Sequence, residues 1–149
     1  TLKLSVNYDK NTGMKYNKDD VYTTPAGTEI RRDDFKPVWK ECARVLKKNG
    51  LLLSGFGNPI EYIFDSGKLE QGILEVKYSV PYADIDHMDD PKIKQIVESG
   101  GYIWSHTLED QIQGQIAAGF AIIGFYEDIG GTALDNYINS SIATKAIKL

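Results

Sequence analysis

The sequence predicts an α/β fold in which helices cover a layered sheet whose last two strands run antiparallel. From residue 34 onward, helical and strand-like patterns follow in the order helix, strand, long irregular segment, helix, strand, strand. Alternating helices and buried strands are typical of α/β layers. The loop of about a dozen residues between the final two strands is too short for a helical crossover, so we expect those strands to be antiparallel neighbours.

Length and composition exclude several other classes of protein. The chain has 149 residues, of which 42% are hydrophobic and 26% charged, and its formal net charge is −4; these values are ordinary for one globular domain. A single cysteine, Cys42, excludes a disulfide scaffold. The acidic balance argues against a nucleic-acid partner, and no apolar run approaches the length of a membrane span. Since no secretory leader pattern is recognisable, we expect a cytoplasmic protein.

The first 34 residues predict an extended, turn-rich segment. Alternating apolar residues at its start have the period of a half-buried strand; these are Leu2, Leu4, Val6 and Tyr8. Residues 9–13 indicate a hairpin turn, in which Gly13 can take a positive φ. A second extended piece over residues 14–23 would then pair back on the first.

Residues 34–48 predict the clearest helix. Its apolar stripe recurs at helical spacing and consists of Phe35, Val38, Trp39, Cys42, Val45 and Leu46. Asp33 or Asp34 can accept the free N–H groups at the start of the helix. The pair Asn49 and Gly50 supplies a left-handed stop at its end.

A buried strand and a long irregular segment follow this helix. The apolar run at residues 51–56 lacks alternation, which predicts a strand buried on both faces, as in a parallel sheet. Residues 57–105 have no dominant period, and they favour a cap or lid inserted beside the sheet. Within that segment, residues 73–80 alternate like a strand and residues 91–98 predict a short helix.

The remaining residues predict one more helix and two strands. A helix begins near Thr107, where Asp110 three residues on resembles a capping box, and it ends at Gly119. Its expected apolar side is formed by Leu108, Ile112 and Ile116. Residues 120–128 then predict a buried strand, and residues 140–149 predict the final strand.

These residues resemble the second half of class I S-adenosylmethionine-dependent methyltransferases. Residues 37–56 resemble that family's helix into its fifth strand, and residues 105–128 its later helix and sixth strand. Residues 140–149 resemble the closing seventh strand, which is inserted antiparallel between the fifth and sixth. The resemblance covers residues 35–149 and implies the C-terminal part of a Rossmann-like methyltransferase sheet, strands five to seven, with an insertion at about residues 57–105.

The resemblance implies a transferase that methylates a small molecule with S-adenosylmethionine. That family binds the cofactor at a glycine-rich turn after its first strand, and no such turn precedes residue 35. Residues 1–34, an extended or hairpin segment of unclear origin, do not resemble the family's fourth strand either. The G-x-G at Gly55 to Gly57 lacks the strand–turn–helix context of a cofactor fingerprint. The chain also begins with Thr1 rather than Met, so we expect a truncated enzyme that binds the cofactor poorly by itself.

Candidate substrate-binding residues lie where strands are expected to end. In open α/β sheets, ligands bind outside the carboxyl ends of the strands. Side chains there that could hold a methyl acceptor are Phe56, Asn58, Tyr62, Tyr82 and His106, with Tyr78 and Trp104 as further wall residues. Each has a structural alternative, because an asparagine can cap a turn, tyrosines can form a core, and a histidine at a helix entry can bind backbone. We assign no catalytic, cofactor-binding or metal-binding residue.

Two other interpretations remain open. The chain could be a non-catalytic α/β module in which residues 1–34 pair a hairpin onto an exposed sheet edge, through which two copies self-associate. It could instead be a different α/β enzyme such as a hydrolase, although the nucleophile elbow of that class is absent from the sequence.

Overall fold

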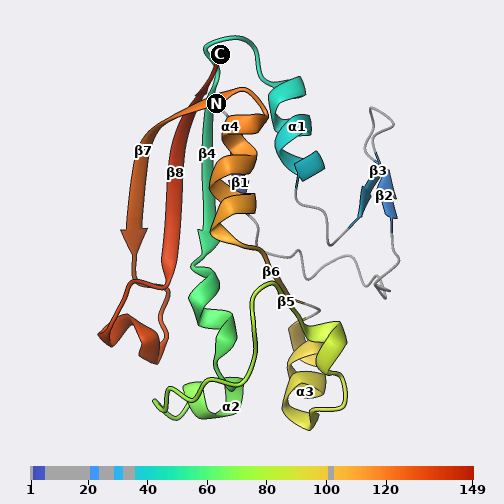
Figure 1. Ribbon diagram of the computed structural model, residues 1–149, viewed down its shortest axis with the longest axis vertical. Helices are drawn as coiled ribbons and strands as arrows, with labels where there is room; N and C mark the ends of the chain where they lie inside the picture. The colour runs from blue at the N-terminus through green and yellow to red at the C-terminus, as the bar shows by residue number, and fades with distance from the viewer. Residues whose placement is uncertain (1, 6–20, 24–28, 32–35, 101–102) are drawn as a thin grey trace.

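A four-stranded mixed sheet forms the centre of the computed structural model, which describes residues 2–5, 21–23, 29–31, 36–100 and 103–149 (Figure 1). The strands lie in the order β1 (Leu2–Ser5), β4 (Leu51–Gly57), β8 (Ser141–Lys148) and β7 (Phe120–Asp128). Strand β1 is parallel to β4, and β8 is antiparallel to both of its neighbours. The predicted antiparallel final pair is therefore confirmed. The carboxyl ends of β1, β4 and β7 all lie at one edge of the sheet.

The N-terminal segment behaves differently from the sequence prediction. A parallel strand from this segment does lie beside β4. Two further short strands, β2 (Val21–Thr23) and β3 (Glu29–Arg31), form a separate antiparallel pair rather than a hairpin on the main sheet. Parallel pairing depends on a distant partner strand, so the local pattern could not reveal it. The predicted turn at residues 9–13 and the caps at Asp33 and Asp34 lie outside the described residues.

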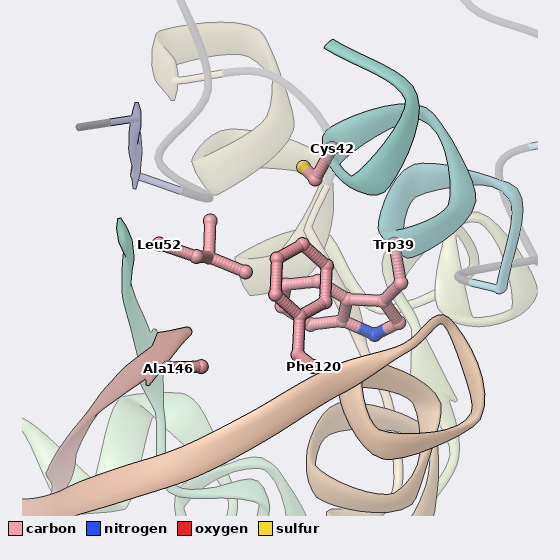
Figure 2. Packing of buried hydrophobic residues seen from close by; sticks show 5 residues of the cluster. All are labelled: Trp39, Cys42, Leu52, Phe120 and Ala146. Atoms are coloured by element: carbon pink, nitrogen blue, oxygen red, sulfur yellow. The ribbon is translucent and has the colours of Figure 1, made fainter. Parts of the chain in front are cut away.

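Helices cover one face of the sheet and enclose the core. Helix α1 (Lys36–Val45) packs there beside α4 (Gly114–Ala117), which follows the π-helical segment η3 (Glu109–Gln113) (Figure 1). Side chains from α1 and three strands meet in one cluster of Trp39, Cys42, Leu52, Phe120 and Ala146 (Figure 2). Buried cysteine acts here as a small apolar side chain.

Two details of this first helix and strand differ from expectation. Helix α1 ends at Val45, which is 50% exposed and does not belong to the buried stripe. Asn49 has a φ of 64° and supplies the predicted left-handed stop. Strand β4 is not buried on both faces, because its residues alternate between buried and partly exposed. One face of β4 meets the helices, and nothing in the described residues covers the other to the same degree.

The helical segment after Thr107 turns a polar face toward the sheet. Its predicted apolar side is wrong, since Leu108 and Ile116 are each 47% exposed, while Gln111 and Gln115 are buried. The predicted cap is confirmed, because the Thr107 hydroxyl accepts a hydrogen bond of 3.1 Å from the backbone N–H of Asp110.

Close packing between the two helices explains this rotation. A Cβ atom at Gly114 would lie 2.5 Å from Cδ1 of Trp39, so only glycine fits at that point. The indole Nε1 of Trp39 also donates a hydrogen bond of 3.0 Å to the backbone oxygen of Asp110. The large indole therefore sets which side of the second helix faces inward.

A buried polar seam joins this helix to the sheet. Nε2 of Gln115 donates to the backbone oxygen of Gln111 at 2.8 Å, and the Thr144 hydroxyl donates to Oε1 of Gln115 at 2.9 Å. Ser54 lies opposite Thr144 in the ladder between β4 and β8. Its buried hydroxyl has no hydrogen-bond partner among the described residues.

The seam gives opposite expectations for two conservative changes. Thr144→Val should lower the free energy of unfolding by about 1–3 kcal/mol, because it leaves Oε1 of Gln115 buried without a donor. Ser54→Ala should be neutral or stabilising, because it removes a buried hydroxyl that is itself unpaired. Urea denaturation of both variants measures the difference, and equal losses would contradict this description of the seam.

The segment between β4 and the second helical region forms a small lobe beyond the end of the sheet (Figure 1). Its elements are η1 (Pro59–Ile63), α2 (Ser66–Leu69), β5 (Tyr82–Ala83), η2 (Asp84–His87), α3 (Pro91–Gly100) and β6 (Trp104–Ser105). The predicted helix at residues 91–98 is confirmed. The predicted strand at residues 73–80 is wrong, since it makes one isolated bridge, from Val76 to Phe64. No helix of the described residues is long and apolar enough to cross a membrane.

Candidate functional site

A cavity of about 590 Å³ lies at the sheet edge where β4 and β7 end. Three separate segments line it. The first is η1, which begins two residues after β4, and the second is the lobe that follows it. The third is the β7–β8 loop, which contributes residues 131–133 beside η4 (Ala133–Asn136). This position outside the carboxyl ends of strands is where α/β sheets bind ligands.

Three tyrosines and a histidine form a continuous aromatic wall. The Tyr82 ring lies nearly parallel to Tyr62, with centroids 6.1 Å apart, and to His87 at 5.2 Å. Tyr78 packs at an angle against both Tyr82 and His87, at 5.0 and 4.6 Å. Such ring pairs stabilise one another beyond their buried area. Tyr62, Tyr78 and Tyr82 all line the cavity.

Asp84 lines the cavity beside this wall and joins two segments of the lobe. Its Oδ1 accepts a hydrogen bond of 2.7 Å from the Tyr82 hydroxyl, and its Oδ2 accepts one of 2.9 Å from the backbone N–H of Ile103. The side chain is 2% exposed. Burial raises the pKa of the Asp84 carboxyl, although both hydrogen bonds act against that rise.

Glu61 is the second acidic group of the cavity, and it is unpaired. No hydrogen bond or ion pair involves its carboxylate among the described residues. Burial raises the pKa of the Glu61 carboxyl, and the carboxylate of Asp135 raises it further. Burial and the charges of Glu61 and Asp84 together raise the pKa of Tyr62 to about 12. The negative charges of Glu61 and Asp84 thus act on the Tyr62 hydroxyl.

Asp135 shapes the β7–β8 loop at the cavity mouth. Its carboxylate accepts hydrogen bonds from the backbone N–H groups of Gly130, Gly131, Thr132 and Ser140, and from the Ser140 hydroxyl. These donors hold the pKa of the Asp135 carboxyl far below its usual range. The loop conformation thus depends on an ionised side chain.

This dependence predicts a pH effect on stability. A carboxyl with a lowered folded pKa contributes stability above its unfolded pKa of about 3.9, and that contribution disappears as the pH falls further. Asp135→Asn should therefore be less stable than the wild type at pH 6, and the two should converge as the pH falls below 4. Thermal denaturation at several pH values checks this, and a constant difference would argue against it.

The structure brings together only two of the five predicted substrate-binding residues. Tyr62 and Tyr82 line the cavity. Phe56 is buried in β4, and Asn58 accepts a hydrogen bond from the N–H of Ile60 at the start of η1, so neither lines the cavity. His106 does not line it either, and its backbone oxygen accepts from the side chain of Gln111.

Sequence reasoning missed the acidic groups of the cavity. Glu61 stands next to Tyr62, and Asp84 begins an acidic stretch at residues 84–90, a pattern that is common in exposed loops. Tyr82 and Asp84 are two residues apart, so in an extended segment their side chains project to the same side. This spacing is the sequence signal that could have predicted their contact. Nothing local links either residue to Thr132, which lines the same cavity from a loop 71 residues after Glu61 and 48 residues after Asp84.

The G-x-G at Gly55 to Gly57 does not form a cofactor turn in the structure. The G-x-G glycines lie within β4, where Gly55 pairs with Ala143 and Gly57 with Ser141. A glycine-rich cofactor turn instead links a strand to a helix N-terminus. Across the described part of the chain, no group of three or more acidic, histidine or cysteine side chains is arranged to hold a metal ion.

Comparison with known proteins finds methyltransferases. No model of a known protein family matches the chain. Over 131 residues, 87% of its length, the chain is 51% identical to "Uncharacterized methyltransferase YbaJ" of Bacillus subtilis (strain 168), and the match covers 51% of that protein. A crystal structure of an S-adenosylmethionine dependent methyltransferase from Mesorhizobium loti matches 78% of the chain and 56% of its own, with a TM-score of 0.50 and 14% identity. The chain thus spans about half the length of these relatives, and the resemblance expected from its motifs is confirmed.

Proposed function

From the resemblance of this chain to class I S-adenosylmethionine-dependent methyltransferases, we propose that it carries the acceptor side of a small-molecule methyltransferase. In this proposal its sheet corresponds to the latter part of the family's sheet, and residues 57–105 are a substrate-binding insertion. The cavity beyond β4 and β7 holds the methyl acceptor.

One observation carries the proposal. The cavity lies outside the carboxyl ends of two parallel strands, the position at which α/β sheets of this kind bind ligands. Its walls are mostly apolar and aromatic with a few convergent polar groups, which is the usual make-up of a small-molecule site. Positioning of the acceptor by such walls is a large part of what a group-transfer enzyme supplies.

The cofactor is held by other residues of the complete protein in this proposal. The described residues lack a glycine-rich turn, and the chain spans about half of its curated relative. We therefore derive no step of methyl transfer from the residues of this chain. What they contribute is the shape and charge of the acceptor cavity.

Filling the cavity tests the proposal. Ala133 lines the cavity, whereas Asn136 lies on the same short helix η4 and is exposed away from it. In the complete protein, Ala133→Phe should raise KM for the acceptor or abolish methyl transfer to a pool of small amines, phenols, thiols and carboxylates. Its calorimetric affinity for S-adenosylmethionine should not change, and Asn136→Phe should behave as the wild type. Unimpaired transfer by Ala133→Phe would reject this cavity as the acceptor site.

A second function, self-association, is favoured by the surface of β7. This strand is one of the two edge strands of the described main sheet, and it exposes Ile123, Phe125 and Tyr126 by 52%, 51% and 57%. Uncovered edge strands invite pairing with another chain. Size-exclusion chromatography with light scattering tests this, and a monomer at all concentrations would remove the alternative.

A further inference from the structure

We propose that the tyrosine-lined cavity binds a small organic cation, held between its aromatic wall and the carboxylate of Glu61. The inference rests on the proposed function only in taking this cation, an amine, as the methyl acceptor. Binding of the cation is a property of the described residues and is tested separately.

The described lining of the cavity is acidic, which favours a cationic ligand. Its lining includes three acidic residues, Glu61, Glu70 and Asp84, and no lysine, arginine or histidine. Glu70 is neutralised by an ion pair of 2.7 Å with Lys92. Asp84 is used by its two hydrogen bonds to Tyr82 and Ile103. Of the acidic residues that the structure describes in the lining, Glu61 is the one without a partner to offset its charge.

Burying a carboxylate without a partner costs free energy, so its surroundings indicate which kind of ligand would stabilise it. Removing a carboxylate from water without a partner disfavours its charged form. The charge that acts on Glu61 is that of another carboxylate, Asp135, which raises the pKa of Glu61 as burial does. A bound cation would offset both the desolvation and this repulsion, while an anion would add a third negative charge.

The aromatic wall also favours a cation, through cation–π contacts with its tyrosine rings. Tyrosine rings attract cations through the negative faces of their π systems, most strongly where water is excluded. The neighbouring cation Lys77 serves only Tyr78, since its Nζ lies 5.1 Å from the centroid of that ring, which leaves the rings of Tyr62 and Tyr82 for a ligand. Its Nζ is held at 2.8 Å by Asp65 and at 2.6 Å by Asp90, and the residue is not part of the lining.

Apolar side chains complete the wall and set the size of the ligand. Phe64, Leu69, Ile96 and Ile103 line the cavity together with the tyrosines. A cavity of about 590 Å³ is within the range of ordinary small-molecule sites. An aliphatic or aromatic body bearing one ammonium group therefore fits it better than a free metal ion or a highly polar sugar.

A matched ligand pair tests the inference on the chain itself. Phenethylamine carries an ammonium group, and 2-phenylethanol has the same body with a neutral hydroxyl. Calorimetry at fixed ionic strength, with amide NMR shifts to locate the site, should show tighter binding of phenethylamine and shifts at Glu61, Tyr62 and Ile103. Equal affinity for the two ligands, or no binding of either, would overturn the inference without any variant.

A variant pair then assigns the charge. Glu61→Gln should weaken phenethylamine binding by at least about tenfold, because hydrogen bonds to charged groups are the stronger class, and should leave 2-phenylethanol unchanged. Glu98→Gln, an exposed position on α3 outside the lining, makes the same change in net charge and should have no effect. Equal weakening by both variants would overturn the assignment to Glu61. If the chain binds the amine but the complete protein methylates no acceptor, the proposed function fails and the cation site stands.

Discussion

Trp39→Ala should lower the free energy of unfolding by about 3–5 kcal/mol, the range found for removal of a large buried aromatic ring. Trp39 is 0% exposed and packs with Cys42, Leu52 and Phe120 at the centre of the core (Figure 2). Its loss also leaves the backbone oxygen of Asp110 without its donor. The helices cannot close the space easily, because the indole fills the gap above Gly114.

Val45→Ala is the matched control for this change. The periodicity of residues 34–48 places Val45 on the same apolar stripe, whereas the structure exposes half of it. Its replacement should therefore change stability by no more than about 0.5 kcal/mol. Urea denaturation measured by circular dichroism compares the two variants. A small loss for Trp39→Ala, or equal losses for both, would contradict the described orientation of α1.

Asp84→Leu should detach the lobe from within, at a cost of about 2–5 kcal/mol. The change leaves the Tyr82 hydroxyl and the backbone N–H of Ile103 buried without an acceptor, and each unsatisfied donor costs about 1–3 kcal/mol. The effect should be local, because the bond from Ile103 to Asp84 lies next to the small β5–β6 pair, which is separate from the main sheet. Hydrogen exchange should therefore accelerate at residues 103–105 before it accelerates in β8.

Tyr82→Phe separates the two hydrogen bonds. It removes one donor and keeps the bond from Ile103 to Asp84, so its cost should be closer to 1 kcal/mol. The exchange rate at Ile103 should then change little. Uniform acceleration across the whole chain in either variant would mean that the lobe does not unfold as a unit of its own.

The elements that sequence alone predicted well are those set by local interactions. The stop at Asn49 depends on a left-handed residue next to the helix end, and the cap at Thr107 depends on a side chain three residues away. The antiparallel final strands follow from a loop length. Each of these features depends only on residues close in the sequence, so the sequence is enough to predict it.

The errors arise where distant segments decide. Leu108 and Ile116 have the spacing of a buried stripe, but Trp39 from another helix needs the glycine face, and the glutamines that turn inward bind each other and Thr144. Residues 73–80 alternate like a strand, but among the described residues they pair with another segment at one isolated bridge only. The periodicity of apolar residues within a segment does not reveal which other segment it packs against.

The candidate site also contains residues that local patterns predict and residues that they do not. Aromatic residues near a strand end favour a ligand wall, and this pattern is enough to predict Tyr62 and Tyr82. The role of Glu61 cannot be predicted in this way, because it depends on the lack of a basic partner among the described residues of the assembled cavity. Asn58 fulfils the structural alternative, as the cap of η1.

Calorimetric titration of S-adenosylmethionine into this chain tests the central claim most directly. In the function that we propose, the chain supplies the acceptor cavity and other residues of the complete protein hold the cofactor. This proposal predicts no binding in the micromolar range, while phenethylamine in the same cell binds. Micromolar binding of S-adenosylmethionine by the chain would contradict this division of the site.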